Sequence, residues 1–191
     1  MNGRPHGDIS QPRIRRCSSQ ELTPSEVASI RALMDVAFGS DEEERFTDDD
    51  WEHALGGLHF ILELDGETIA HASVVLRGLE VNGRPFRTGY VEAVATAPGR
   101  QGMGFGSQLM SDVTAYVRDG FELGALGTGR HSFYERLGWR RWIGPSSVRT
   151  AGGACPTPDD DGYIMVLPTQ AGRPFERTAP ISCDWRPGDV W

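Results

Sequence analysis

Three closely spaced glycines are the first feature of this sequence that suggests chemistry. Residues 94–106 read VATAPGRQGMGFG, so Gly102, Gly104 and Gly106 follow an apolar run and come directly before a sequence with helical periodicity. A loop that leads from a strand into a helix presents unpaired backbone amides and the positive end of the helix dipole. Glycines there remove Cβ atoms that would hold an anion away, and they permit positive φ values that aim successive amides at one point. The spacing therefore indicates a phosphate-binding loop.

Glu92 is the second residue that suggests chemistry. It interrupts residues 89–97 (GYVEAVATA), which are otherwise nearly all apolar and typical of a central buried strand. A carboxylate at such a place is costly unless it has a partner or a task. The alternative is that Glu92 lies on the solvent-facing side of the strand.

The acidic residues are unevenly distributed. The formal net charge is −8, with seven acidic residues within 41–50 and three more at 159–161. This distribution disfavours nucleic acid and anionic membranes as partners and suits a cationic one. For residues 41–44 we prefer the simpler interpretation of a solvated loop.

Length and composition favour one soluble domain. The chain has 191 residues, 38% of them hydrophobic, and its apolar runs are too short to cross a bilayer. The residues after Met1 contain no apolar segment of the kind a secretory signal needs, so we expect a cytoplasmic protein. Cys17, Cys155 and Cys183 are widely spaced, which suggests neither a disulfide framework nor a zinc site, and we expect no metal.

The elements that must position these residues alternate along the chain. We expect residues 1–12 to be a disordered terminus and 13–191 to form the single domain. Capping signals, turn dipeptides and periodicity predict helices at 24–38, 104–119 and 131–137, and strands at 13–18, 59–64, 68–79, 89–97, 123–126 and 139–143. This order predicts a mixed α/β sheet with at least one parallel crossover around the helix at 104–119.

The expected elements restrict the class of ligand that the glycine loop can bind. No Gly-Lys-Ser/Thr follows the glycines, so the loop is not a P-loop. Antiparallel hairpins precede the strand, which argues against a dinucleotide-binding βαβ unit. Coenzyme A (CoA) is the diphosphate ligand that remains.

Two motifs resemble landmarks of the GCN5-related N-acetyltransferases. Gln101, Gly104 and Gly106 resemble that family's acetyl-CoA loop, Gln/Arg-x-x-Gly-x-Gly/Ala, between a strand and a helix. Residues 132–139 (SFYERLGW) resemble its aromatic-rich short helix, in which a tyrosine lies near the sulfur of the cofactor. The resemblance implies an α/β fold with a central mixed, mostly antiparallel sheet flanked by helices and a parallel crossover after the acetyl-CoA loop.

A narrower resemblance extends over most of the chain. The aminoglycoside 2′-N-acetyltransferases are similar in five blocks, in the same order: residues 46–59, 89–94, 144–148, 157–162 and 183–191. The resemblance implies transfer of acetyl from acetyl-CoA to the 2′-amine of aminoglycoside antibiotics, and thus antibiotic resistance. It also implies a homodimer.

The resemblance assigns the cofactor contacts residue by residue. The backbones of Val94, Ala95 and Thr96 are expected to bind the pantetheine arm as an added strand does. The Val94 amide would face the thioester oxygen, where it can stabilise an oxyanion. These three residues can equally be core strand, and both roles are compatible. The pyrophosphate is expected within the loop formed by Gln101, Gly102, Met103, Gly104, Phe105 and Gly106.

The catalytic pair is also implied by the resemblance. Glu92 is expected to accept the proton of the acceptor amine through a water, because an ammonium group cannot attack a thioester. Tyr134 is expected to donate a proton to the CoA thiolate, although it can also be a packed aromatic between Phe133 and Leu137. No activated Ser or Cys is apparent, so we expect direct transfer.

The substrate contacts explain the acidic excess. An aminoglycoside carries several ammonium groups, which carboxylates around a cleft attract and hold. The resemblance implies contacts by Glu92 and Ala93, by Asp159, Asp160 and Asp189, and by the C-terminal carboxylate of Trp191. Residues added after Trp191 are therefore expected to damage activity.

Two departures from the family lie on the acceptor side. Arg45 stands where the family has Asp, so one ammonium contact is lost or moves to Glu44. Residues 126–129 lack the family's serines.

The sequence leaves two alternative functions open. One is an acetyltransferase of the same fold for another amine, such as a polyamine, a peptidoglycan amino sugar or a protein N-terminus. The other is a non-catalytic aminoglycoside-binding protein.

Overall fold

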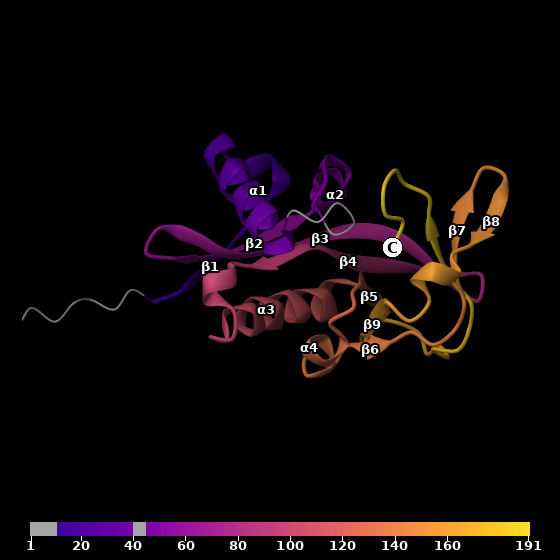
Figure 1. The fold of residues 1–191 in the computed structure, drawn as a ribbon. Coiled ribbons are helices and arrows are strands. Elements are labelled where there is room, and N and C mark those ends of the chain that lie inside the picture. The colour runs from indigo at the N-terminus through magenta and orange to yellow at the C-terminus, as the bar shows by residue number, and fades with distance from the viewer. Residues whose placement is uncertain (1–10, 40–44) are drawn as a thin grey trace, which may run out of the picture.

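One mixed sheet runs through the protein, with helices on both of its faces (Figure 1). The structure is a computed structural model that describes residues 11–39 and 45–191. The elements in this part of the chain are β1 (Arg13–Ser18), η1 (Ser19–Glu21), α1 (Pro24–Phe38), α2 (Asp48–Ala54), β2 (Leu58–Leu64), β3 (Glu67–Val81), β4 (Arg84–Thr96), η2 (Pro98–Arg100), α3 (Phe105–Gly120), β5 (Leu123–Gly127), α4 (His131–Glu135), β6 (Arg140–Arg141), β7 (Ser146–Thr150), β8 (Gly153–Pro156), η3 (Pro158–Asp160), β9 (Ile164–Pro168) and β10 (Ile181–Asp184).

The long hairpin of β3 and β4 is the centre of the sheet. The two strands pair antiparallel from Ala70 to Val81 of β3 with one register shift, and they are joined by a tight turn at Asn82 and Gly83, whose φ angles are 49° and 72°. Positive φ at both positions is typical of a type I′ turn. The order across the sheet is β6-β9-β5-β4-β3-β10-β7-β8, and β2 and β1 extend from the first half of β3. The mostly antiparallel sheet and the parallel crossover from β4 through α3 to β5 are as predicted.

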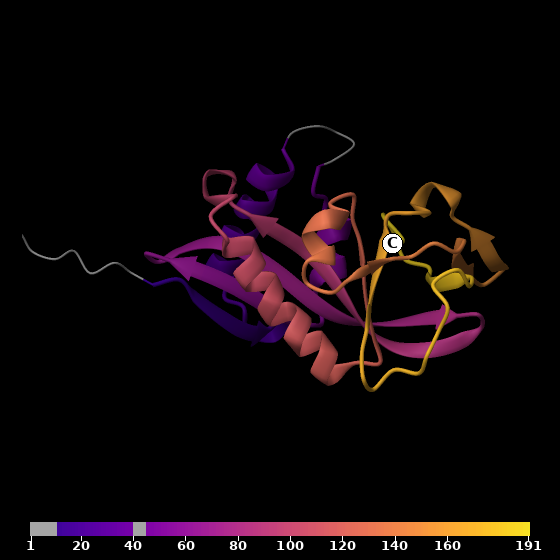
Figure 2. The ribbon, with the colours of Figure 1, turned by 90° about the horizontal axis from the view of Figure 1, so that it is seen from below.

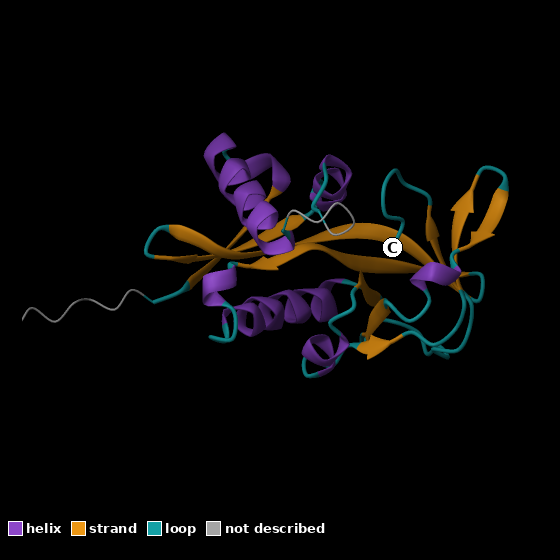
Figure 3. Ribbon diagram, in the orientation of Figure 1, coloured by secondary structure: helices purple, strands orange, loops and turns teal. Residues whose placement is uncertain are grey.

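The helices divide between the two faces of the sheet. Figure 3 shows α1 and α2 on one face, and α3 and α4 on the other. Seen from below in Figure 2, α3 crosses its face obliquely and α4 lies beside it. Helix α1 begins as predicted, because Thr23 and Glu26 form a capping box, and it ends at Gly39 with φ 78°. None of the helices in the described ranges is long and apolar enough to span a bilayer.

Helix α2 is an element that the sequence did not predict. Residues 48–54 lie between the helix predicted at 24–38 and the strand predicted at 59–64, where the sequence predicted no element. Thr47 caps the helix and Asp50 completes the capping box, while Trp51 and Ala54 are buried against the sheet. The acidic first turn suits the positive end of the helix dipole, so the same charges that favour a loop also favour a helix start.

The chain after residue 139 also differs from the prediction. The expected strand at 139–143 is reduced to Arg140 and Arg141, because Trp139 and Trp142 turn inward and are only 1% exposed. Strands β7 to β10 were not predicted. Residues 1–10 and the acidic residues 41–44, including Glu44, lie outside the described residues.

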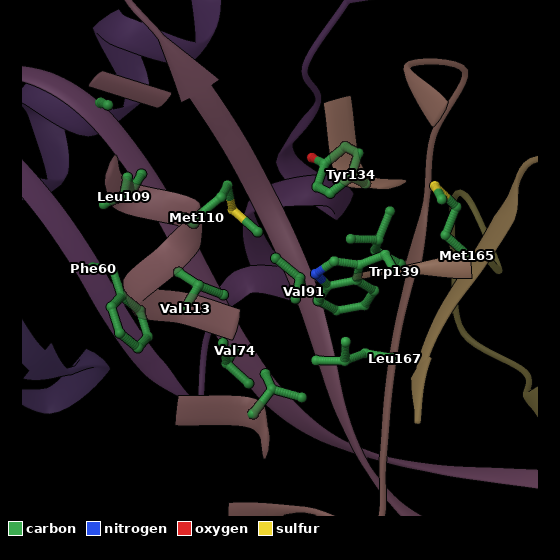
Figure 4. Close-up of a cluster of buried hydrophobic side chains, with 14 of the residues drawn as sticks. Phe60, Val74, Val91, Leu109, Met110, Val113, Tyr134, Trp139, Met165 and Leu167 are labelled. Atoms are coloured by element: carbon green, nitrogen blue, oxygen red, sulfur yellow. The ribbon is translucent and has the colours of Figure 1, made fainter. Parts of the chain in front are cut away.

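Buried side chains form separate cores on the two faces of the sheet. Helix α3 contributes Leu109, Met110 and Val113 to the larger core, where they meet strand residues such as Val91 (Figure 4). On the opposite face, α1 and α2 cover a smaller core. A third cluster lies where β7, β9 and β10 meet the end of the long hairpin, and it includes Trp191. The last residue of the chain is therefore part of the core.

Candidate active site

Strands β4 and β5 separate in the middle of the sheet. Their parallel pairing is confined to Thr88, Gly89 and Tyr90 of β4, although β4 continues to Thr96. Strand β5 pairs on its other side with β9 as far as Gly127. In the described chain, the β5-facing edge of β4 beyond Tyr90 thus carries no ladder pairing. Such an edge can accept an extended ligand as an added strand.

A β-bulge lies in this separated part of β4. The register shifts between His71 and Ser73, so that Ala93 and Val94 together oppose Ala72. Ala93 has φ 48°, a left-handed conformation that residues with a Cβ rarely adopt. Bulges turn backbone groups out of the regular ladder. Here these backbone groups belong to Ala93, which the resemblance assigns to the acceptor, and to Val94, which it assigns to the thioester.

The glycine loop adopts left-handed backbone conformations directly before α3. Gly102 and Gly104 have φ 76° and 90°, and Gly104 caps α3 without any side-chain hydrogen bond. The first amides of α3 are therefore left to a ligand. A Cβ on Gly106 would lie 2.9 Å from the Oγ1 of Thr96, so only glycine allows α3 to approach the end of β4 this closely. Gln101 donates from Nε2 to the carbonyl oxygen of Thr96 (3.1 Å), which fixes the start of the loop.

Glu92 is buried and paired with a cation. Its side chain is 14% exposed, and its Oε1 lies 2.5 Å from Nη1 of Arg186, which is itself 14% exposed. The solvent-facing alternative for Glu92 is therefore wrong. Burial raises the pKa of the Glu92 carboxyl group, Arg186 and then Arg77 lower it, and Asp50 raises it. The net shift is upward.

Arg186 is a site residue that the sequence analysis missed. Its Nε donates to the backbone oxygen of Asp189 (2.8 Å), and its guanidinium lies 5.5 Å from the ring centroid of Tyr90. The signal in the sequence was its position within the last similar block, between Trp185 and Asp189. Nothing local indicated that it would reach Glu92.

Tyr134 lies on α4 at the margin of the larger core. It is 6% exposed and makes edge contacts with Phe133 and Trp139, at centroid distances of 4.9 and 6.2 Å. Figure 4 shows its ring above Trp139 with the hydroxyl directed away from Met165. Burial raises the pKa of the Tyr134 phenol above its ordinary value. The residue is thus both a packed aromatic and a phenol that stays protonated at neutral pH.

Two of the expected ammonium contacts lie close to each other. Burial raises the pKa of the Asp160 carboxyl group, a hydrogen bond from Thr157 lowers it, and the charges of Asp189 and Asp159 raise it. Asp161, the third member of this acidic run, instead accepts hydrogen bonds from the backbone and hydroxyl of Ser146 (2.8 and 2.7 Å). Asp161 is therefore structural.

Helix α2 adds further polar groups that the sequence analysis did not assign to the site. His53 bonds through Nε2 to the carbonyl oxygen of Pro187 (2.8 Å), and a Cβ on Gly188 would lie 2.9 Å from Cβ of Asp49. The loop around Arg186 thus packs under α2. Asp50 in the first turn of α2 lies close enough for its charge to raise the pKa of Glu92.

The C-terminus is docked against β5. Trp191 is 9% exposed, and its indole Nε1 donates to the Oγ1 of Thr157 (3.0 Å). A Cβ on Gly127 would lie 3.2 Å from the carbonyl carbon of Trp191. Arg77 donates to the backbone oxygen of Val190 (2.6 Å). The tail is thus docked on the domain, and Gly127 of the segment that lacks the family's serines lies directly beside the terminal carboxyl group.

The separated strands and the amide-lined loop define a class of protein. Residues 18–142 match the family described as "Acetyltransferase (GNAT) domain". A GNAT family N-acetyltransferase (YhbS) from Escherichia coli, solved in complex with CoA, superposes with a TM-score of 0.60 at 18% identity, covering 91% of this chain and 90% of that one. A GNAT family acetyltransferase from Brucella melitensis, solved with acetyl-CoA, gives 0.58 at 20% identity, covering 86% and 92%. These similarities confirm the predicted fold.

A sequence relative identifies the family more narrowly. A protein of Mycolicibacterium fortuitum named aminoglycoside 2′-N-acetyltransferase is 39% identical to this chain, over 98% of this chain and 100% of the relative. The chain belongs to the aminoglycoside 2′-N-acetyltransferases, within the GCN5-related N-acetyltransferase family. The resemblance seen in the sequence blocks is thereby confirmed.

Proposed function

We propose that this protein transfers the acetyl group of acetyl-CoA directly to the 2′-amine of an aminoglycoside and so inactivates the antibiotic. One observation carries the proposal most strongly. A buried carboxylate, Glu92, lies in the bulged part of β4 and is held by a cation of the C-terminal tail. A polycationic amine is the kind of substrate that such a carboxylate would bind and deprotonate.

The open edge of β4 and the glycine loop are the proposed acetyl-CoA site. The backbones of Val94, Ala95 and Thr96 would hold the pantetheine arm, because this edge has no strand partner in the described chain. The residues from Gln101 to Gly106 would surround the pyrophosphate, since the first amides of α3 have no partner within the helix and Gly106 removes the Cβ that would block close approach. Acetyl-CoA supplies an acetyl group activated as a thioester.

Glu92 is the proposed general base. Burial raises its pKa, which brings the carboxyl group closer in proton affinity to the amine that it must deprotonate. Arg186 occupies this carboxylate in the structure. An ammonium group of the acceptor would therefore compete with the guanidinium for Glu92. The Val94 amide is proposed to stabilise the oxyanion that forms when the amine attacks.

Tyr134 is the proposed general acid. The phenol is protonated at neutral pH, so Oη carries a proton that it can give to the leaving thiolate. In this proposal the acetyl group passes directly from acetyl-CoA to the amine. No residue of the described site is assigned the role of an acyl-accepting nucleophile.

The remaining carboxylates are proposed to bind the other ammonium groups of the substrate. Asp189 lies close enough to Asp160 for its charge to raise the pKa of the Asp160 carboxyl group, which favours a cation between the two. Asp159, the backbone of Ala93 and the carboxylate of Trp191 complete the proposed acceptor site. The proposal includes a homodimer in the cytoplasm.

Two closely similar acceptors test the proposal. We would follow thiol release from acetyl-CoA with kanamycin B, which has a 2′-amine, and kanamycin A, which has a 2′-hydroxyl. Turnover with kanamycin B alone is expected. Turnover with both would move the reaction to another amine. Turnover with neither, despite binding, would indicate a binding protein or a different amine substrate.

A further inference from the structure

A pair of buried histidines lies behind the candidate active site and has no part in the proposed reaction. His59 on β2 and His71 on β3 are both 0% exposed. Nδ1 of His59 lies 2.9 Å from Nε2 of His71, and Nδ1 of His71 lies 2.8 Å from the carbonyl oxygen of Ala93. At the other end, Nε2 of His59 lies 2.8 Å from Oγ of Ser19. These contacts form one continuous chain of hydrogen bonds from Ser19 to the bulge of β4.

The carbonyl at the end of the chain determines where every proton lies. A carbonyl oxygen only accepts, so His71 must carry its hydrogen on Nδ1. In a neutral imidazole Nε2 is then an acceptor, and it must receive the hydrogen on Nδ1 of His59. Nε2 of His59 in turn accepts from the hydroxyl of Ser19, whose oxygen accepts from the amide of Gly56 (2.9 Å).

Both rings are neutral, as this arrangement requires. Burial lowers the pKa of His59 to about 4. Burial also lowers the pKa of His71 to about 3, with a further lowering by His59 and an opposing effect of the bond to Ala93. Trp51 of α2 covers His59, at a ring centroid distance of 6.0 Å. Each ring nitrogen has one partner, so the chain has a single direction and ends on Ala93.

The backbone of Ala93 has an unfavourable conformation. Its φ of 48° is unfavourable for a residue with a Cβ, and it has no ladder partner on β3. In a trans peptide the carbonyl of one residue and the amide of the next point in opposite directions. A bond that holds the Ala93 oxygen toward His71 therefore turns the Val94 amide to the other side.

We propose that His71, oriented by His59 and Ser19, is a positioning residue that fixes the bulge and thereby aims the Val94 amide. Its catalytic consequence rests on the proposed function, in which this amide stabilises the oxyanion. The claim that His71 fixes the bulge does not rest on that function, because the hydrogen bonds and the left-handed Ala93 are features of the free protein.

The first test needs neither a variant nor an activity. The ¹⁵N shifts of the histidine rings in the wild-type protein at pH 7 report which nitrogen carries the hydrogen. We expect both His59 and His71 to be neutral and protonated on Nδ1. Protonation of His71 on Nε2 would overturn the proposal, because His71 could not then donate to Ala93.

The second test compares two replacements of His71. Asn places an amide N–H near the position of Nδ1, whereas Leu fills the space without a donor. His71→Leu is expected to shift the Ala93 resonances away from left-handed values and to lower kcat about 10-fold or more, with the Kd of CoA changed less than about 3-fold. His71→Asn is expected to restore both. Equal loss in the two variants, or a left-handed Ala93 in His71→Leu, contradicts the proposal.

A third variant keeps the test decisive if leucine prevents folding. Ser19→Ala removes the partly exposed end of the chain and leaves the bonds from His59 to His71 and from His71 to Ala93 in place. Because the Ala93 carbonyl sets the proton positions, we expect both rings to stay protonated on Nδ1 and Ala93 to stay left-handed, and a move of either ring to the Nε2 tautomer would contradict the proposal. If the wild-type protein acetylates no aminoglycoside, the proposed function fails, while the ring tautomers and the Ala93 resonances still decide this inference.

Discussion

At the scale of single residues, the pairing of Glu92 with Arg186 is the central observation. Each of these charges would be costly to bury alone, and each is 14% exposed in the pair. The pair keeps a carboxylate ionisable inside the protein while leaving its partner exchangeable for another cation. The two residues therefore make separate predictions.

Replacing Glu92 by Gln removes the proposed base without changing its shape. We expect kcat/KM to fall about 100-fold or more. Because the pKa of Glu92 is raised, the wild-type enzyme should lose activity as the pH falls through a value above the ordinary 4.5 of a glutamate. This acidic limb should be absent from the variant, which initial rates measured across pH would show.

A carboxylate elsewhere in the sheet provides the control for that experiment. Glu80 on β3 pairs with Arg149 (3.6 Å) at the far end of the hairpin. Glu80→Gln should retain the wild-type rate and pH profile. A similar loss in both variants would show that Glu92 acts through stability alone.

Replacing Arg186 by Met keeps the apolar stem and removes the charge. Arg186 lowers the pKa of Glu92, so the acidic limb of the rate profile should move to higher pH. The ionised Glu92 would be left buried without its partner, at a cost of about 3 kcal/mol in unfolding free energy. A carboxyl group whose pKa is raised by folding stabilises below its unfolded pKa and loses this contribution as the pH rises through the folded pKa. Urea unfolding should therefore show a larger loss at pH 8 than at pH 5, and an equal loss would contradict the assignment.

At the scale of elements, the approach of α3 to β4 depends on one glycine. A Cβ at Gly106 would lie 2.9 Å from Oγ1 of Thr96. Gly106→Ala should therefore displace the helix N-terminus and weaken CoA binding about 10-fold, measured by calorimetry. Combining it with Thr96→Ala removes the clashing atom and should recover most of the affinity.

The same loop supplies a matched control for this prediction. Gly99 lies in η2, and a Cβ there would meet nothing within 4 Å. Gly99→Ala should bind CoA as the wild-type protein does. Equal weakening at positions 99 and 106 would mean that loop flexibility, and not the approach of α3, limits binding.

At the scale of the whole molecule, the tail from β10 to Trp191 lies at the proposed acceptor side of the site. Its end packs against Gly127, with Trp191 held by Thr157. A short Gly-Ser extension after Trp191 would enter the proposed acceptor site and would remove the terminal charge at that point. We expect kcat/KM for the aminoglycoside to fall about 10-fold or more, in steady-state assays, while the Kd of CoA is unchanged.

An extension at the other end of the chain tests whether the loss of activity is specific to the C-terminal tail. The same extension placed before Met1 should leave the kinetics unchanged. Full activity with the C-terminal extension would show that the carboxylate of Trp191 does not contact the acceptor.

The sequence predicted the elements whose signals are local. Helix α1 has its capping box, the β3 and β4 hairpin has its Asn-Gly turn, and α3 has its glycine loop. These features could be predicted from the sequence because each depends on residues that are only a few positions apart. The prediction failed where local signals conflict, as in α2, whose acidic start is equally compatible with a loop, and in β6, where two tryptophans turn inward.

The sequence by itself thus determined the fold class, the family and most of the residues proposed for the site. The tertiary structure alone decided which distant residues meet them. Arg186 reaches Glu92 across 94 positions, and His71 reaches the Ala93 carbonyl only because β4 bulges against β3. Such contacts depend on strand register and on the docking of the tail. Both are fixed by the packing of the whole core, and no short stretch of sequence encodes them.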